Sequence, residues 1–428
     1  MTQALRTLLQ QAEQARQDTW AAILQARIER SQGRDDEALR LLDIVLTREP
    51  DHPYALFLKS AVLPPDRVAE SLTMLDALIA QHSSAPQLHA RHLLALAMFN
   101  RAFALGRLDR PQDALAAYED LLAKFEDAPE PQLRGEVATA MFNKAYPLER
   151  MRRPQEALAT YDALVAKFGD APEAQIRWQV AMAMFNKSSM LRSPQEELAA
   201  HDNLIAKFGN ALEPQLRGVV AMALFVKGEV LGRMQRFQEQ LAICDDLVAR
   251  FGNVMHPHIC TPVARAMFAK GETLRRLEKF QEALAAYDAL LERFSAAREW
   301  EIRQEVALAM FNKGEILTQM KRFQDALAAY DGLLAKFVDE SHPYVRPMVP
   351  MALLSKGITL GLMGWPEDER AAYAELLAKF GDNSDFEPAA AIESAISDKG
   401  ATLRRMGRSQ DELAAFNELA AKFASLSN

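Results

Sequence analysis

The chain has 428 residues, a formal net charge of −8 and a composition that is 49% hydrophobic and 25% charged. The excess of acidic residues argues against a dedicated nucleic-acid-binding protein, which normally has a surface patch rich in lysine and arginine. The chain has only two cysteines, Cys244 and Cys260, which excludes a disulfide framework. We find no apolar run of signal-peptide or membrane-spanning length, and we therefore expect a cytoplasmic protein.

Residues 1–86 are predicted to form an amino-terminal helix followed by two irregular helical hairpins. The stretch from Trp20 to Pro50 has the length of one hairpin and ends in turn-forming residues. Pro64-Pro65-Asp66 interrupts the second hairpin, because proline removes a backbone donor and disfavours helix in the residue before it. We expect these two hairpins to act as a cap.

A repeated tetrapeptide, Ala-Met-Phe-Asn, organises residues 87–428. It occurs at 97–100, 140–143, 183–186 and 309–312, and its first two steps are each 43 residues. Degenerate copies continue the period, with one shorter step of 40 residues around positions 190–194. A fixed period of this size is typical of a repeat array whose units bury their apolar faces against one another. We predict eight helical hairpins in this region.

One unit, residues 127–169, illustrates the predicted hairpin. Asp127 is expected to cap a first helix that runs to Met151, and a second helix is expected over Gln155 to Phe168. Gly169 is expected to end the second helix in a left-handed conformation. Each helix has one apolar stripe, formed by Val137, Met141, Ala145 and Leu148 in the first and by Ala157, Leu158, Tyr161, Leu164 and Val165 in the second.

Small residues recur at one position of the first helix. Glycine costs about 1 kcal/mol relative to alanine inside a helix, so its repeated use predicts a close approach of the two helices. An alanine follows twelve residues later in several units. The small residues are Gly228, Gly271, Gly314, Gly357 and Gly400, with Ala145 and Ser188 elsewhere, and the alanines are Ala157, Ala283 and Ala326.

This pattern resembles the tetratricopeptide repeat, in which a small residue, an alanine and then an aromatic residue recur. The aromatic residues here are Tyr118, Tyr161, Tyr287, Tyr330, Tyr373 and Phe416. The long units and the His-Pro helix starts at 256–257 and 342–343 are similar to the kinesin-light-chain type. The resemblance implies an all-α, right-handed superhelix of about ten hairpins, in which the first helix of each unit (helix A) lines the concave side and the second (helix B) the outside.

Some positions depart from that family pattern. Larger polar residues replace the alanine at Glu197, Gln240, Glu369 and Glu412, and lysine replaces a usual leucine at Lys144, Lys187, Lys227, Lys270, Lys313, Lys356 and Lys399. Some family members bind a terminal carboxylate through a lysine four residues before the Asn. Only Arg265 is basic at those places here, so that carboxylate clamp is not expected.

The candidate partner-binding residues lie on the helix-A stripe beside the core stripe, where residues three or four apart share a face. Each unit is expected to present an aromatic residue, an amide and a charge to an extended peptide. The alternative is that the phenylalanines pack between adjacent A helices and that the asparagines serve local structure. The residues are Phe99, Asn100, Phe142, Asn143, Tyr146, Phe185, Asn186, Phe225, Arg265, Phe268, Glu272, Phe311, Asn312 and Glu315.

No motif for catalysis or cofactor binding is present. The sequence lacks a glycine-rich phosphate loop, a His-Glu-x-x-His helix and a Gly-x-Ser-x-Gly elbow. His256, His258 and Cys260 lie close together, but no second pair of ligands accompanies them, so a metal site is disfavoured. We predict no catalytic residue, no cofactor and no metal.

The sequence therefore favours a non-catalytic scaffold or adaptor that binds another protein or a peptide segment on its helix-A surface. The alternative is a regulatory sensor whose superhelix changes shape when a peptide or protein binds. A helical repeat that binds nucleic acid is disfavoured by the acidic charge, and no membrane partner is expected. The last helix leaves Leu413, Phe416 and Leu419 without a following helix, which suggests self-association at that end.

Overall fold

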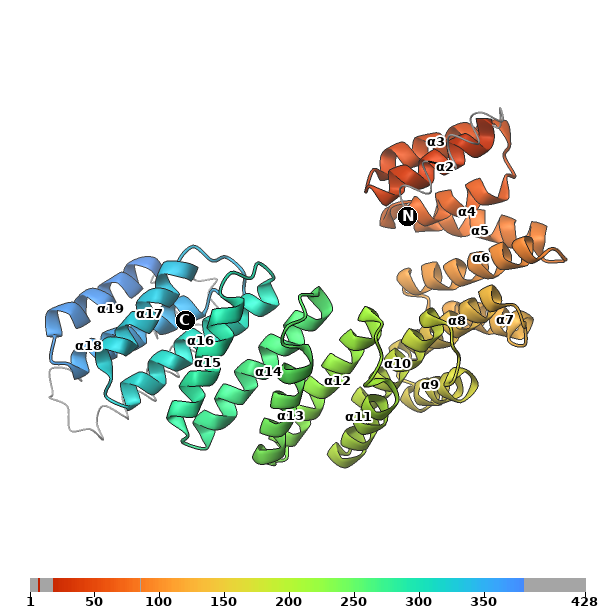
Figure 1. The fold of residues 1–428 in the computed structure, drawn as a ribbon. Coiled ribbons are helices and arrows are strands. Elements are labelled where there is room, and N and C mark those ends of the chain that lie inside the picture. The colour runs from red at the N-terminus through yellow and green to blue at the C-terminus, as the bar shows by residue number, and fades with distance from the viewer. Residues whose placement is uncertain (1–6, 8–17, 85, 381–428) are drawn as a thin grey trace. The chain divides into compact units, whose positions relative to one another are not determined.

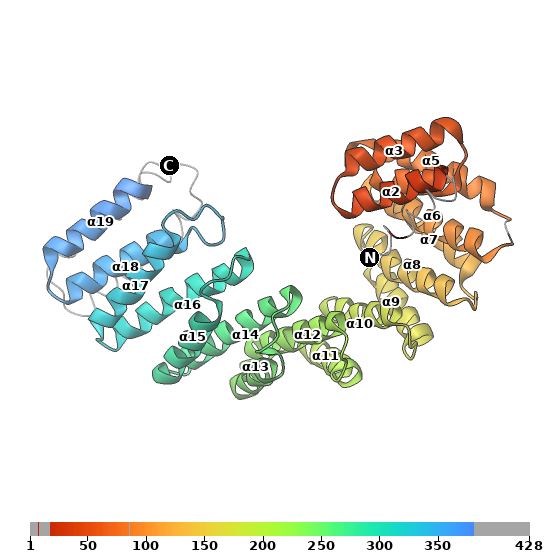
Figure 2. The same cartoon turned by 45° about the horizontal axis from the view of Figure 1, so that its top comes forward.

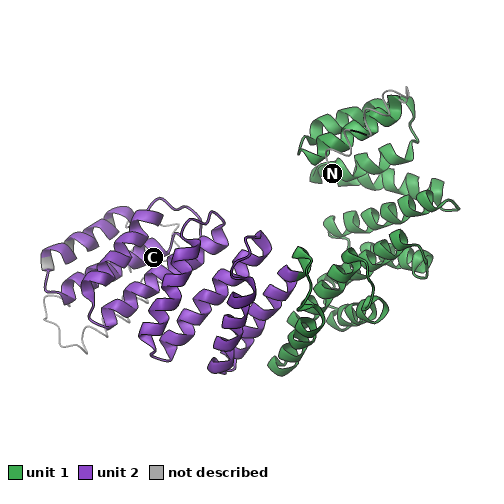
Figure 3. Ribbon diagram, in the orientation of Figure 1, with its two compact units in different colours: residues 1–216 green, residues 217–428 purple. Residues whose placement is uncertain are grey.

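The computed structural model describes residue 7 and residues 18–84 and 86–380, and every regular element in these residues is a helix (Figure 1). The chain divides into two compact units, residues 1–216 and 217–428 (Figure 3). No described helix is long and apolar enough to cross a membrane. The all-helical prediction is confirmed. The predicted tenth hairpin, with Gly400, Glu412 and Phe416, lies outside the described residues.

The described residues of unit 1 form five helical hairpins, each made of an A helix and the following B helix. A 3-10 turn at Pro65–Arg67 separates the two helices of the second hairpin. The pairs are α2 (Asp18–Ser31) and α3 (Asp35–Arg48), α4 (Pro53–Val62) and α5 (Val68–His82), α6 (Leu88–Arg107) and α7 (Pro111–Phe125), α8 (Pro131–Arg150) and α9 (Pro154–Phe168), and α10 (Ala174–Ser189) and α11 (Pro194–Phe208).

Unit 2 contains four hairpins within its described residues, and its first helix begins just before the boundary between the units. The consecutive helices of each hairpin lie side by side in both views (Figures 1 and 2). The pairs are α12 (Pro214–Arg233) and α13 (Phe237–Phe251), α14 (Pro257–Arg276) and α15 (Phe280–Phe294), α16 (Trp300–Gln319) and α17 (Phe323–Phe337), and α18 (Met348–Leu362) and α19 (Pro366–Phe380).

The shorter repeat step corresponds to a shorter A helix. Helix α10 has 16 residues, whereas α8 has 20, and α10 ends at Ser189 before the loop that leads to Pro194. The missing residues therefore shorten the end of helix A. The predicted division between a cap and an array at residue 86 stays a prediction.

Two details of the predicted helix ends are wrong. Helix α8 begins at Pro131 with no side-chain cap, and Asp127 instead accepts a hydrogen bond from Lys167 Nζ at 3.3 Å. Proline suits the first helical position because the amide hydrogen it lacks would have no partner there. Gly169 has φ −54°, a right-handed helical conformation.

The left-handed residues of the described chain lie instead in the turns between helices A and B. Two of them are glycine, Gly33 and Gly364, and the other five are not. Asp109, Arg152, Gln235, Glu278 and Lys321 have φ between 55° and 61°. After each of them the next amide donates back into helix A, as Arg153 N does to Leu148 O at 2.9 Å. This hydrogen bond ends helix A and redirects the chain into helix B.

In three hairpins of unit 2 a glycine of helix A lies directly against a tyrosine of helix B, at the position where small residues predicted a close approach. A methyl group added at Gly271 would lie 2.8 Å from Tyr287 Cζ, and one at Gly314 would lie 2.6 Å from Tyr330 Cζ. Tyr287 and Tyr330 are fully buried. Gly228 differs, because it faces Cys244 rather than a tyrosine, and an added methyl group would lie 3.7 Å from Ile243 Cγ2.

Two of the large polar residues that replace alanine on helix B, Gln240 and Glu369, are accommodated by a second glycine on helix A. Gln240 is buried and accepts a hydrogen bond from Thr273 Oγ1 at 2.9 Å. A methyl group added at Gly232 would lie 2.7 Å from Gln240 Nε2, and one at Gly361 would lie 2.6 Å from Glu369 Cδ. At both places the glycine of helix A therefore leaves room for the larger polar side chain of helix B.

The lysines of helix A make ion pairs to the preceding hairpin. Lys144 Nζ lies 3.0 Å from Glu119 Oε1, and Lys356 Nζ lies 2.7 Å from Asp331 Oδ1. Each acidic partner is 25 residues earlier, on the preceding helix B. Exposed pairs contribute about 0–1 kcal/mol each, so their main effect is on the register between hairpins. The same pairing occurs in Lys187–Asp162, Lys270–Asp245 and Lys313–Asp288.

Candidate functional site

The predicted phenylalanines lie against the aromatic residue of their own helix B. The ring centroids are 5.9 Å apart in Phe99–Tyr118 and 5.8 Å apart in Phe185–His201. Phe142 also approaches Trp178 of the next A helix, at 6.3 Å. The remaining pairs are Phe142–Tyr161, Phe268–Tyr287 and Phe311–Tyr330, at 6.0, 5.9 and 6.2 Å.

These phenylalanines combine packing with exposure. Phe311 is buried, and the other five are half-buried, so most of them retain some surface for a ligand. Phe225 has no aromatic partner on helix B, where Cys244 stands, and the Arg265 guanidinium lies 6.0 Å from its ring centroid. Five of the ring contacts of these phenylalanines join the two helices of one hairpin, and the contacts Phe142–Trp178 and Phe225–Arg265 join adjacent A helices.

Two of the predicted asparagines connect successive hairpins. Asn186 Nδ2 donates to the hydroxyl of Tyr161 at 3.4 Å, and Asn312 Nδ2 donates to the hydroxyl of Tyr287 at 3.5 Å. Asn143 Nδ2 donates locally to Thr139 O at 2.8 Å. The amide nitrogens of these three side chains are therefore already engaged within the protein.

Carboxylates accept hydrogen bonds from the tyrosine hydroxyls of helix B, and two of these carboxylates, Glu272 and Glu315, were predicted site residues. Tyr287 donates to Glu272 Oε1 at 3.4 Å, Tyr330 donates to Glu315 Oε1 at 2.8 Å, and Tyr161 donates to Glu149 Oε1 at 3.4 Å. Burial raises the pKa of Tyr161 to about 12, with the nearby Glu149 adding to the effect. The hydroxyl therefore stays protonated and can donate to the carboxylate.

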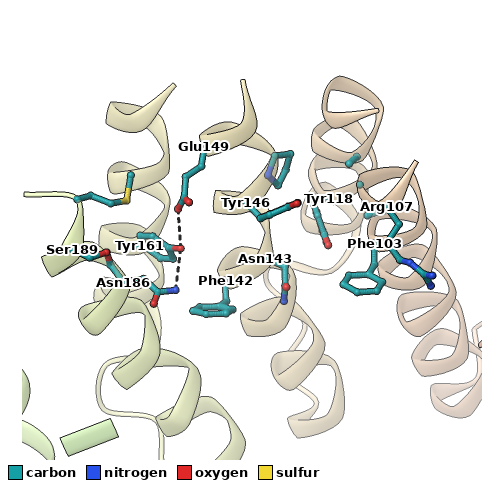
Figure 4. Close-up of a pocket in the computed structure, with 15 residues that line it drawn as sticks. Phe103, Arg107, Tyr118, Phe142, Asn143, Tyr146, Glu149, Tyr161, Asn186 and Ser189 are labelled. Atoms are coloured by element: carbon teal, nitrogen blue, oxygen red, sulfur yellow. Dashed lines mark hydrogen bonds between the residues drawn. The ribbon is translucent and has the colours of Figure 1, made fainter. Parts of the chain in front are cut away.

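A cavity of about 550 Å³ opens on the helix-A side of unit 1 (Figure 4). We call it the aromatic groove. Phe103 and Tyr146 are the most exposed of its aromatic residues, at 51% and 54%. The predicted residues Phe142, Asn143, Tyr146 and Asn186 line it together with Ala102, Phe103, Gly106, Arg107, Ala114, Tyr118, Pro147, Glu149, Tyr161, Ser189 and Met190.

Sequence reasoning missed Phe103 and the role of Pro147. Phe103 follows Phe99 by one helical turn, and their rings stack with centroids 6.4 Å apart, so the i, i+4 spacing was the available signal. Pro147 lies inside α8 and has no amide hydrogen to donate to the Asn143 carbonyl four residues earlier. The helical hydrogen bond is therefore absent at the wall of the aromatic groove.

A second cavity, of about 610 Å³, opens on the helix-A side of unit 2, and we call it the charged groove. Arg265 Nε lies 3.7 Å from the buried carboxylate of Glu305. Burial raises the pKa of Glu305 to about 7, although Arg265 acts in the opposite direction. The predicted residues Phe225, Arg265, Phe268 and Glu272 line it together with Glu229, Gly232, Arg233, Gln240, Ala269, Thr273, Arg276, Glu305 and Leu308.

The remaining predicted residues line neither groove. These are Phe99, Asn100, Phe185, Phe311, Asn312 and Glu315. Sequence reasoning also missed Glu305, because no repeat position marks a carboxylate that faces the preceding hairpin. The structure thus gathers eight of the fourteen predicted residues into two grooves, four in each.

Both cysteines, Cys244 and Cys260, are free and buried. Cys244 is buried, and burial raises the pKa of its thiol to about 12, so it is protonated at neutral pH. His256 and His258 lie ring to ring at 5.4 Å, while Cys260 Sγ contacts Val254 O at 3.7 Å. Among residues 7, 18–84 and 86–380, no three potential ligands gather as they would around a metal ion.

Comparisons with known proteins identify a repeat family and a fold. The tetratricopeptide-repeat family model matches residues 99–172 and 264–341. No curated protein matches the sequence. The solved structure of apo RapI is 11% identical, with a TM-score of 0.51, and the match covers 89% of this chain and 97% of RapI. At this identity the likeness concerns the fold alone.

Two further solved structures are similar over most of this chain. The apo quorum sensor NprR from B. thuringiensis is 12% identical with a TM-score of 0.41, and the match covers 86% of this chain and 99% of NprR. The signal transduction ATPase with a tetratricopeptide-repeat sensor from Pyrococcus horikoshii is 10% identical with a TM-score of 0.48. That match covers 81% of this chain and 52% of the ATPase.

Proposed function

Because the chain is a tetratricopeptide-repeat protein, we propose that it is a non-catalytic scaffold or adaptor that binds a segment of a partner protein on its helix-A side. The observation that carries this proposal is the aromatic groove of unit 1. Phe103 and Tyr146, at 51% and 54% exposure, offer apolar area without a covering side chain. Exposed aromatic residues beside polar groups are typical anchor points of protein interfaces.

The polar groups of the aromatic groove suit an extended peptide. The carbonyl of Asn143, which the helix cannot satisfy through Pro147, supplies an acceptor. The half-exposed amides of Asn143 and Asn186 have carbonyl oxygens that can accept from a peptide backbone. Arg107 adds an exposed cation at one edge. Together with the aromatic rings, these groups can bury an apolar side chain of the peptide and form hydrogen bonds with its backbone.

The proposal can be tested with a peptide ligand. The peptide is selected from a phage-displayed library of short random sequences for binding to the immobilised full chain. Replacing Tyr146 and Phe103 together with alanine is expected to weaken its binding at least about tenfold, because each ring is an exposed anchor. Fluorescence anisotropy measures the affinity. The control is Leu212→Ala, since Leu212 is 86% exposed and lies outside the groove. Equal affinities for the double variant and the control would contradict the proposal.

A second candidate is a sensor, favoured by the way the aromatic groove spans a junction between hairpins. Its wall includes Tyr161 and Asn186, which belong to successive hairpins and share a hydrogen bond. A ligand that displaced this contact would change the packing of the two hairpins, which touch only their neighbours.

The sensor function predicts that the selected peptide changes the small-angle scattering profile of the full chain. The Asn186→Ala variant lacks the connecting hydrogen bond and is expected to show a smaller change than the unmodified chain. A profile that stays the same at saturating peptide would leave the scaffold function standing and contradict the sensor.

A further inference from the structure

A third cavity, of about 690 Å³, lies across the three A helices α2, α4 and α6 of unit 1. No predicted site residue lines it, and we call it the N-terminal groove. Its floor consists of buried aliphatic side chains such as Ile23, Leu58 and Leu93. The other lining residues are Trp20, Leu24, Arg27, Arg30, Ser31, Tyr54, Phe57, His92 and Leu96.

An aromatic cluster forms one wall of the N-terminal groove. The Trp20 ring lies 5.4 Å from the rings of both His52 and Tyr54, edge-on to the histidine and tilted to the tyrosine. His52 is itself fixed, because its Nδ1 accepts from the amide of Ala55 at 3.3 Å and caps α4. Trp20 is 39% exposed, so the cluster presents a firm apolar surface to a ligand.

The charged side chains that line the N-terminal groove are basic. Arg27 and Arg30 are exposed on α2, and neither makes an ion pair with a described residue. The neighbouring Glu29 is buried and already paired with Arg34. His92, on the facing helix α6, lies 3.4 Å from Glu136, which does not line the groove. This cationic patch contrasts with the net charge of −8 of the whole chain.

We propose that the N-terminal groove binds a segment of a partner protein in which apolar side chains are flanked by carboxylates. The apolar side chains would cover Trp20, Leu24 and Leu96, and the carboxylates would pair with Arg27 and Arg30. Arginine suits this role because its planar group binds a carboxylate through two hydrogen bonds. The site shares no lining residue with the aromatic groove, so it does not depend on the function proposed above.

The two grooves nevertheless open on one face of the same helix. His92, Leu96, Phe99 and Phe103 follow one another at helical spacing along α6, with the first two in the N-terminal groove and the last in the aromatic groove. Phe99 stacks on Phe103 between them. A single extended partner segment that occupies both grooves would therefore follow α6.

Two labelled peptides test the proposal on the full chain by fluorescence anisotropy. One has the sequence Glu-Glu-Leu-Phe-Leu-Glu-Glu, and the other has lysine in place of every glutamate. The acidic peptide is expected to bind at least about tenfold more tightly, with an affinity that falls as salt is raised. Replacing Arg27 and Arg30 together with glutamate is expected to abolish that preference, and Trp20→Ala is expected to weaken both peptides.

The matched control replaces Arg48 and Arg298 together with glutamate. Both are exposed and line neither groove, so this double variant is expected to leave the preference intact. Equal binding of the two peptides would overturn the proposal, as would an equal loss in the control. A photo-crosslinking residue at Leu24 reports the occupant directly. Crosslinks to the acidic peptide support the proposal, whereas crosslinks only to residues 1–17 or to a second copy of the chain would overturn it.

Discussion

Replacing Gly314 with alanine is expected to lower the free energy of unfolding by about 1–3 kcal/mol, the usual cost of overpacking a core. The added methyl group would lie 2.6 Å from Tyr330 Cζ and closer still to Cε1. The ring has no room to retreat, because it is fully buried and its hydroxyl is held by Glu315 at 2.8 Å. Urea denaturation followed by circular dichroism measures the change.

Gly228→Ala is the matched control because Gly228 has the same repeat position in another hairpin. There the added methyl group meets Ile243 Cγ2 at 3.7 Å, an ordinary contact, and Cys244 stands in place of the tyrosine. Alanine should then stabilise the helix by up to about 1 kcal/mol. Similar losses in the two variants would show that close packing against tyrosine is not the reason for glycine. Hydrogen exchange assigns each change to its own hairpin, since arrays of repeats need not unfold in one step.

Raising the pH from 4 to 8 is expected to destabilise the unmodified chain, relative to Glu305→Gln, by about 3 kcal/mol. Burial raises the pKa of Glu305 to about 7 from an ordinary value of 4.5. The folded state therefore binds this proton more tightly than the unfolded state. The resulting stability is fully present below pH 4.5 and is lost as the pH rises through about 7.

Denaturation curves of the two proteins across this pH range measure the difference. The change is assigned to the charged groove because Glu305 faces Arg265 there, at 3.7 Å, and is 8% exposed. Glu292→Gln serves as the control, since Glu292 is exposed on α15. A stability difference between Glu305→Gln and the unmodified chain that stays constant from pH 4 to pH 8 would refute this pKa shift and its cause.

The hairpins could be predicted from the sequence because helix patterning and small residues are local signals. Gly271, Gly314 and Ala283 occupy the positions of close approach that their spacing indicated. Gly169 shows the limit of such rules, since the chain takes its left-handed turn at Arg152 instead. The hydrogen bond from Arg153 to Leu148 closes that turn through the backbone, so a residue such as Arg152 gives no sequence signal for it.

The candidate sites were predicted less well because they depend on contacts between hairpins. The stripe of Phe142, Asn143 and Tyr146 was found from helical spacing, and it lines the aromatic groove. The hydrogen bond from Asn186 to Tyr161 joins residues 25 positions apart, and nothing in one repeat indicates it. The N-terminal groove was missed for a related reason, since Trp20 and Tyr54 belong to irregular hairpins that share no repeat position.

The ion pairs between lysine and the acidic residue 25 positions earlier have a consequence for how such a chain grows. Lys144 and Lys356 make the same contact at distant junctions of the two units. Suppose that a duplicated hairpin is inserted in register. Its lysine would then pair with the acidic residue of the hairpin before it, and its acidic residue would pair with the lysine of the hairpin after it. This ion pair would therefore be kept at each new junction when the array changes length.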